Sequence, residues 1–230
     1  MDKENPRQEI EAAVATNDLQ RLLEICGLLH GHFCPGSATG VKAAARAVRE
    51  LDVKSTGMEE VVAIVETNSC FSDGVQMVTG CSFGNNGLIY RDYGKTAVTL
   101  TRRTGDAVRV AQKANRSPLE KFPEAATLFQ KVIKERNGTE EDEEKLRRLW
   151  IDISFKMVDI PDEEIFDISR LDIRVPAYAR IFASVTCSLC GENTMEPRAR
   201  MKDGKPVCLS CSDQDYYQLA GDGISMIRHR

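Results

Sequence analysis

The chain has 230 residues, of which 42% are hydrophobic and 29% charged, a composition typical of a globular protein and not of a disordered, collagen-like or membrane-spanning one. Its 31 Lys and Arg residues are outnumbered by 35 Asp and Glu residues. Because nucleic-acid binding relies on a basic excess, we expect no nucleic-acid partner. No apolar stretch follows the charged residues 1–6, so we expect no signal peptide, no membrane span and a cytoplasmic location.

Three helices are predicted in the first third of the chain. Apolar residues recur with a helical period over residues 17–30, where Asn17 or Asp18 is placed to cap the helix. An Ala-rich second helix is expected over residues 36–51. Residues 72–78 predict a third, shorter helix that ends before a glycine.

Strand patterns are interleaved with these helices. Residues 61–67 are β-branched and apolar, which predicts a buried strand. The sequence GNNG at residues 84–87 predicts a turn between the strand candidates 81–83 and 88–90. Two further strand candidates follow, residues 95–102 and 107–110. We therefore expect a mainly antiparallel sheet packed with helices, an α+β fold.

The pattern becomes helical again after this sheet. Residues 118–157 predict helices, one of which begins after Thr139 with an acidic, solvated first turn. Residues 161–176 are interpreted as connecting structure. We accordingly predict a core domain over residues 1–180, with a helical insertion at 112–165, and a small zinc-binding domain over residues 181–230.

Four cysteines near the C-terminus form two C-x-x-C pairs separated by seventeen residues: Cys187, Cys190, Cys208 and Cys211. This spacing predicts a four-cysteine zinc site, in which four thiolates leave no open position and the metal is structural. A rubredoxin-like iron site or a pair of redox dithiols is the competing interpretation. Acidic and basic residues balance from residue 187 onward, which favours a folding and docking element over a nucleic-acid binder.

A second cluster lies in residues 30–36 (HGHFCPG), which contain two of the three histidines. If this loop is extended before Pro35, His32 and Cys34 project from the same side, and His30 is better suited to handling protons. The helix that follows favours ionisation of the Cys34 thiol. The cluster thus predicts metal binding or thiol chemistry.

Further candidates follow the predicted strands. Cys70 and Cys81 lie in loops at strand ends, where functional sites are usually assembled. Asp73 and Gln76 are three residues apart and share one face if the segment is helical. Cys26 lies on an apolar helix face and is interpreted as a core residue.

Together, the segments 30–36, 70–76, 80–84 and 92–95 (DYGK) resemble the family of the E subunit of formylmethanofuran dehydrogenase. The resemblance implies an α+β core, often in an intertwined homodimer, with a treble-clef-like zinc finger attached. It also implies association with the molybdenum or tungsten enzyme that reduces carbon dioxide to formylmethanofuran in methane-forming microbes. The family's core motif falls on His30, His32, Cys34, Cys70, Asp73, Gln76, Cys81 and Lys95.

Our leading hypothesis is a metal-binding protein with structural zinc and a second transition metal, expected to be zinc, held by His32, Cys34 and Cys70. Together with these three, His30 and Asp73 form the expected catalytic group. Gln76, Cys81 and Lys95 are the expected cofactor-binding residues. The sequence leaves open whether the protein is an enzyme; as one, it would be an oxidoreductase subunit.

Two alternatives remain. The first is a carrier or assembly factor that hands a metal or metal cofactor to a partner. The second is a thiol redox protein in which Cys34 pairs with Cys70 or Cys81. The expected partners are a second copy of the chain and subunits of a molybdenum or tungsten enzyme.

Overall fold

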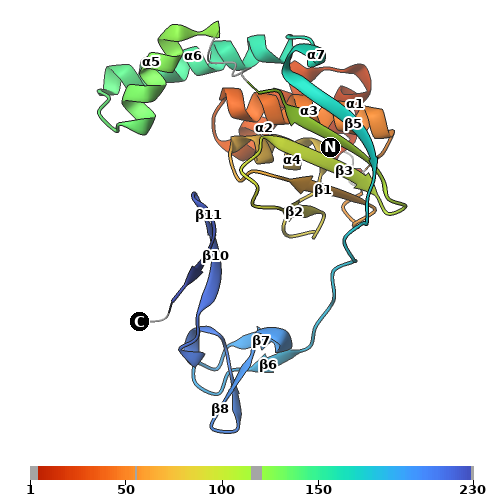
Figure 1. Cartoon of the computed structure of the whole chain (residues 1–230), viewed down its shortest axis with the longest axis vertical. Helices are drawn as coiled ribbons and strands as arrows, with labels where there is room; N and C mark the ends of the chain where they lie inside the picture. The colour runs from red at the N-terminus through yellow and green to blue at the C-terminus, as the bar shows by residue number, and fades with distance from the viewer. Residues whose placement is uncertain (1–4, 55, 115–120, 229–230) are drawn as a thin grey trace. The chain divides into compact units, whose positions relative to one another are not determined.

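A computed structural model describes residues 5–54, 56–114 and 121–228 and divides the chain into two compact units, residues 1–176 and 177–230 (Figure 1). The first unit combines helices with a five-stranded sheet, and the second consists of small β-hairpins. The expected α+β architecture is thereby confirmed. No helix in the described parts of the chain is long and apolar enough to cross a membrane.

The helices of the first unit follow the predicted pattern with two additions, one at the N-terminus and a short one at residues 162–165. They are α1 (Gln8–Thr16), α2 (Leu19–His30), α3 (Pro35–Leu51), α4 (Cys70–Thr79), α5 (Pro123–Phe129), the π-helix η2 (Gln130–Lys134), α6 (Glu140–Val158) and α7 (Asp162–Ile165). Asp18 caps α2 by accepting a hydrogen bond from the Arg21 N–H at 2.9 Å. Asn17 ends α1 in the left-handed conformation, so the two cap candidates serve different helices.

The sheet has the strand order β2-β1-β3-β4-β5. Its strands are β1 (Val61–Val65), β2 (Leu88–Tyr90), β3 (Ala97–Arg102), β4 (Asp106–Gln112) and β5 (Phe166–Asp172). Four of the strands pair antiparallel, and β2 runs parallel to its neighbour β1, with Ala63 opposite Leu88. The expectation of a mainly antiparallel sheet holds.

The turn predicted at residues 84–87 and the strand predicted at residues 88–90 are confirmed, but the strand expected at residues 81–83 does not form. The strand after the turn, β2, instead pairs parallel with β1. The Asn85 side chain accepts hydrogen bonds from the N–H groups of Ser82 and Gly87, at 2.8 and 3.0 Å, and donates to the Gly80 carbonyl at 2.6 Å. These bonds fold the segment into a closed loop that carries the chain to the far edge of the sheet.

The interpretation of residues 161–176 as connecting structure is also wrong, because they contain α7 and β5. The strand β5 pairs antiparallel with β4 along its whole length, from Phe166 opposite Gln112 to Asp172 opposite Asp106. It is an edge strand whose later side chains are exposed. Polar edge strands lack the buried alternation that identifies a strand in a sequence.

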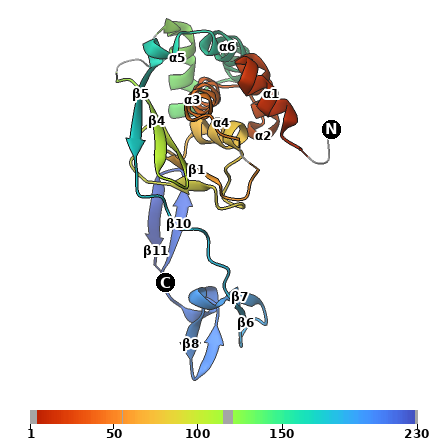
Figure 2. The ribbon, with the colours of Figure 1, turned by 90° about the vertical axis from the view of Figure 1, so that its right-hand side faces the viewer.

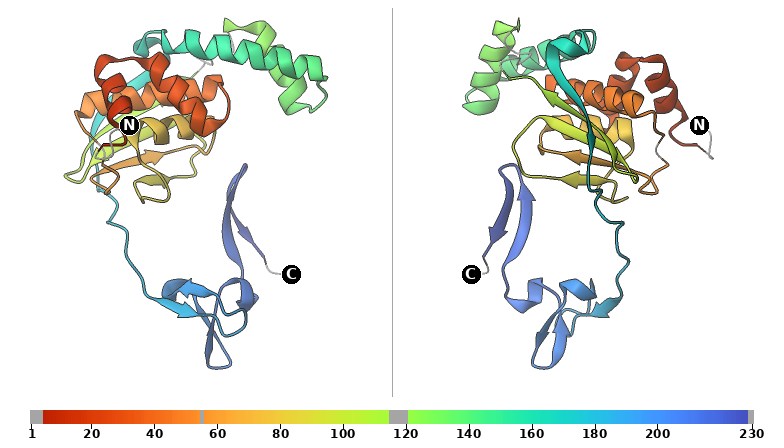
Figure 3. Two further views of the ribbon diagram at one scale, coloured as in Figure 1. Left: turned by 180° about the vertical axis from the view of Figure 1, so that it is seen from behind. Right: turned by 45° about the vertical axis from the view of Figure 1, so that its right-hand side comes forward.

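Helices α3 and α4 lie against the sheet, with α1 and α2 outside them (Figures 2 and 3). Small residues allow α3 and α4 to approach closely. A Cβ atom on Gly40 would lie 2.0 Å from the Phe71 carbonyl oxygen, and one on Gly74 would lie 2.4 Å from the Val41 nitrogen. This close crossing sets the two helix N-termini, and the cysteines there, beside each other.

Helix α6 extends beyond this helical layer, with α5 packed on its N-terminal part (Figure 3). The buried Lys42 of α3 anchors the opposite end of α6, because its ammonium group contacts the Val158 carbonyl at 3.0 Å and the Asp162 carboxylate at 2.9 Å. The expected helix start after Thr139 is confirmed by a capping box with Asp142. The assignment of residues 112–165 as an insertion stays a prediction.

The second unit contains three two-stranded sheets. They pair β6 (Ser184–Thr186) with β7 (Asn193–Met195), β8 (Arg200–Lys202) with β9 (Lys205–Val207), and β10 (Tyr216–Ala220) with β11 (Gly223–Ile227). Short 3-10 helices lie at Glu196–Arg198 (η3) and Ser210–Ser212 (η4). Its buried hydrophobic side chains are Cys187 and Val207. A unit with so little apolar burial requires another source of stability.

Candidate functional site

The N-terminal cluster is assembled where α3 and α4 begin. Cys34 is the N-cap of α3, with its thiol 3.4 Å from the Ser37 N–H, and Cys70 is the first residue of α4. A Cβ atom on Gly36 would lie 3.0 Å from the Cys70 Cβ and 3.8 Å from both sulfur atoms. Glycine at this position therefore leaves room for the two thiols to meet.

The last residue of α2, His30, completes this arrangement. Its Nδ1 lies 2.7 Å from the Asp73 carboxylate on α4, and its Nε2 lies 3.5 Å from the Cys34 sulfur. Gly31 follows in the left-handed conformation, with a φ of 80°, and turns the chain away from the helix. Asp73 thus orients the imidazole so that its other nitrogen faces the thiol.

Three potential metal ligands lie together here. The ligand atoms of His30, His32 and Cys34 are all within 4.8 Å of one another. The expected set contained Cys70 in place of His30, but Cys70 is not among the ligand atoms that lie within 4.8 Å of one another. Two imidazoles and one thiolate are a donor set suited to zinc, and three protein ligands leave a position open.

The surroundings favour a thiolate at Cys34. The hydrogen bond from Cys70, followed by those from Ser37 and the charge of His30, outweighs burial and lowers the pKa of Cys34 to about 4. The same hydrogen bond and burial raise the pKa of Cys70. Burial lowers the pKa of His30, but its hydrogen bond to Asp73 and the Cys34 charge reverse the effect, so the net pKa is raised.

The remaining predicted residues are placed differently. Gln76 donates to Asp73 at 3.1 Å, which confirms that the two share a helix face. Cys81 is buried past the opposite end of α4, and its thiol donates to the Val61 carbonyl at 3.5 Å. Lys95 is exposed beside Glu66. Among the described residues, neither Cys81 nor Lys95 forms a hydrogen bond or ion pair with His30, His32 or Cys34.

The structure adds two residues to the cluster that the sequence analysis did not identify. Ser37 supports the thiol through its N–H and hydroxyl groups. Trp150 of α6 stacks on His32 at 5.8 Å between ring centroids. Ser37 could have been found as the third residue of a capped helix, whereas no local pattern links Trp150 to His32.

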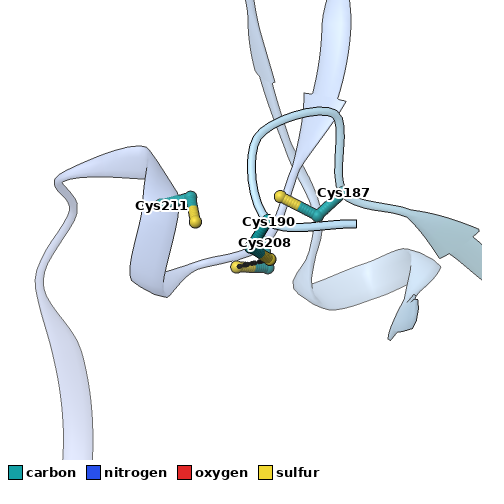
Figure 4. Close-up of side chains that lie close together, drawn as sticks. All are labelled: Cys187, Cys190, Cys208 and Cys211. Carbon is teal, nitrogen blue, oxygen red and sulfur yellow. Dashed lines mark hydrogen bonds between the residues drawn. The ribbon is translucent and has the colours of Figure 1, made fainter. Parts of the chain in front are cut away.

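The C-terminal cysteines form a second, separate cluster. The four sulfur atoms lie within 4.8 Å of one another, and those of Cys190 and Cys208 are 3.9 Å apart (Figure 4). A tetrahedral zinc ion with Zn–S bonds of about 2.3 Å holds its sulfurs about 3.8 Å apart, so the four side chains fit zinc. Backbone N–H groups of Cys190 and Cys208 lower the pKa of Cys187 to about 6.

The chain thus combines two units: a mixed helix and sheet unit that contains the cluster of His30, His32 and Cys34, and a small unit that contains the four-cysteine cluster. Residues 29–167 match the family described as "FmdE, Molybdenum formylmethanofuran dehydrogenase operon", and the chain belongs to this family. Residues 180–217 match the prokaryotic dksA/traR C4-type zinc finger. This match and the cluster of four cysteines indicate zinc binding, as the cysteine spacing predicted.

Two known proteins are similar to the chain. A crystal structure of a tungsten formylmethanofuran dehydrogenase FmdE-like protein from Syntrophus aciditrophicus is similar with a TM-score of 0.57 and 25% identity, over 84% of this chain and 91% of that one. A probable S-adenosyl-L-methionine-binding protein of Archaeoglobus fulgidus is 41% identical over 93% of this chain. The chain spans 58% of that relative's length.

Proposed function

We propose that the first unit contains a metal site in which His30, His32 and Cys34 bind a transition metal ion, expected to be zinc. This site has one open coordination position. The observation that carries this proposal is the convergence of the three ligand atoms within 4.8 Å. Compared with the set expected from the sequence, His30 replaces Cys70. A metal bound this way supplies a Lewis acid that polarises a carbonyl group or activates a water molecule.

The residues around the metal ligands have distinct parts in this site. The Asp73 carboxylate accepts the Nδ1–H of His30, which leaves Nε2 as the nitrogen that faces Cys34 and the metal. Cys70 lies beside Cys34 and lowers the pKa of its thiol, which favours the thiolate. Gln76 holds the second oxygen of Asp73 at 3.1 Å and keeps the carboxylate aimed at the imidazole.

We place this activity in or beside molybdenum- or tungsten-dependent formylmethanofuran metabolism, as an oxidoreductase subunit or an accessory of one. The family description and the name of the Syntrophus protein support this placement, since both include formylmethanofuran dehydrogenase. The proposed assembly is a homodimer that contacts the other subunits of the larger enzyme. Purification of the protein from native cells tests this assembly: the subunits of the larger enzyme should copurify with it, and their absence would contradict the proposed contact.

The metal content of the untagged full-length chain tests the proposed site. Plasma mass spectrometry is expected to find two metal equivalents per chain, one for each cluster. Cys34→Ser should lower this to one while circular dichroism stays unchanged, and the matched variant Cys81→Ala should keep both. One equivalent in the native chain, unaffected by Cys34→Ser, would contradict a core metal.

A second candidate function is thiol redox chemistry, favoured by the proximity of Cys34 and Cys70, whose sulfur atoms both lie 3.8 Å from the position of a Cβ atom on Gly36. In this case the Cys34 thiolate attacks glutathione disulfide and displaces one glutathione thiolate, and the Cys70 sulfur then displaces the second, so that a Cys34–Cys70 disulfide forms and two electrons pass to two glutathione molecules, one of which takes up the Cys70 proton. Mass spectrometry after alkylation would show a Cys34–Cys70 disulfide in metal-free protein. A core metal that exchanges readily, with no disulfide, would instead favour the carrier function.

A further inference from the structure

A cavity of about 470 Å³ opens beside the His/Cys cluster. Its apolar floor is formed by Val132, Leu146 and Trp150, which belong to the small hydrophobic cluster between η2 and α6. His32 lines the same cavity and stacks on Trp150. Small-molecule sites commonly enclose roughly 300–1,000 Å³ with mainly apolar walls and a few polar groups, so this cavity has the size and lining of one.

The turn between η2 and α6 gives the cavity a positive rim. Gly138 lets this turn lie against the cavity floor, because a Cβ atom there would be 2.7 Å from the Val132 side chain. Arg136, held in the left-handed conformation with a φ of 53°, and Arg147 on α6 both line the opening. Within the described parts of the chain, neither guanidinium forms an ion pair or a side-chain hydrogen bond. Both are therefore available to an anion.

A further polar group narrows the choice of ligand. Glu143 is the only carboxylate among the described residues of the lining, and it can accept a hydrogen bond from a ring N–H. A planar ring that carries such a nitrogen donor satisfies this carboxylate, and the aromatic ring of Trp150 favours stacking with it.

We propose that this cavity binds a planar nitrogen heterocycle that carries a phosphate or carboxylate group, with the anion at Arg136 and Arg147 and the ring toward His32. This inference rests on the proposed core site, because His32 belongs to both the cavity and the metal cluster. It assigns a substrate or cofactor class to that site: the ring reaches the metal ligands while the arginines hold the anionic end. Planar guanidinium groups suit both carboxylate and phosphate geometry.

Matched ligands test this inference on the full chain. Isothermal titration calorimetry should show binding of flavin mononucleotide at least about tenfold tighter than riboflavin, which has the same ring without the phosphate, since a charge-assisted contact contributes about 1.5 kcal/mol or more. Inorganic phosphate alone should not bind measurably. The chain has one tryptophan, so quenching of its emission gives a second readout of flavin binding.

Variants then decide whether the cavity is responsible. Arg136→Gln combined with Arg147→Gln should remove the preference for flavin mononucleotide over riboflavin. Arg148→Gln is the matched control, because Arg148 pairs with Glu144 on the surface and does not line the cavity. No binding of flavin mononucleotide, equal binding of both flavins, or a preference that survives the double variant would overturn the inference.

Metal analysis of the same samples separates this inference from the proposed function. A metal-loaded core without selective flavin binding would overturn the cavity inference alone. Arginine-dependent flavin binding to a chain without core metal would overturn the metal proposal alone, and would leave the cavity as a ligand site beside the thiols.

Discussion

The two cysteine-containing clusters differ in how the chain supports them. The C-terminal cluster has four thiolates and hardly any apolar core around it, since Cys187 and Val207 are its buried hydrophobic residues. The cluster of His30, His32 and Cys34 instead lies at the ends of helices that are packed into an extensive core. We therefore expect the finger to depend on its metal for its fold, whereas the proposed core site depends on its fold for its ligand geometry.

Removal of zinc from the finger should produce the largest effect. Structural zinc contributes about 10–16 kcal/mol in small fingers, so Cys187→Ser should unfold the second unit and leave the first intact. Hydrogen exchange read by mass spectrometry should show lost protection in the strands of the second unit, residues 184–227, and not in the first unit. Ser188→Ala, a neighbouring change that removes no ligand, is the control. Retained protection in the finger of Cys187→Ser would contradict its dependence on metal.

A larger side chain where α3 crosses α4 should lower the stability of the first unit. Gly40→Ala places a methyl group 2.0 Å from the Phe71 carbonyl oxygen and should cost about 3 kcal/mol or more. Gly84→Ala meets its nearest atom at 3.9 Å and should cost little. Urea unfolding measures both variants. Equal stability of the two would mean that the close approach of α3 and α4 does not limit packing.

The orientation of His30 can be tested without disturbing the fold. Asp73→Asn removes the carboxylate that accepts from Nδ1, and loss of such a partner weakens metal binding by about 10- to 100-fold. Competition with a fluorescent chelator should show this loss at the core site and none at the finger. The exposed Asp159→Asn serves as control, and equal affinities would remove Asp73 from the site.

The smallest expected effect is a pH-dependent change in the free energy of unfolding, caused by the ion pair between Glu66 and Arg109. Arg109 binds both oxygens of the buried Glu66 at 2.8 Å, and this contact lowers the pKa of Glu66. The resulting stability is full above the unfolded pKa of about 4.3 and is lost as the pH falls through the folded value.

Glu66→Gln should therefore lower the free energy of unfolding by about 1–3 kcal/mol at neutral pH and by progressively less in acid. Urea unfolding of both proteins across this range measures the difference. Glu164→Gln, which breaks an exposed pair with Lys121, should change stability by less than about 1 kcal/mol at any pH. A constant difference for Glu66→Gln would contradict the ion pair as its source.

Local signals in the sequence were sufficient for several features. The Asp18 cap, the glycines that end α2 and α4, and the start of α6 after Thr139 were predicted correctly because capping depends on neighbouring residues. The zinc finger was predictable for the same reason, since each C-x-x-C pair brings two ligands to the metal within one turn.

Tertiary structure decided the rest. The parallel pairing of β2, the edge strand β5 and the replacement of Cys70 by His30 among the close ligand atoms depend on segments that meet only after folding. The sequence by itself determined which residues could serve as caps, ligands and core. The crossing of α3 with α4 and the packing of α6 determined which of them meet, because contacts between distant segments leave no local pattern.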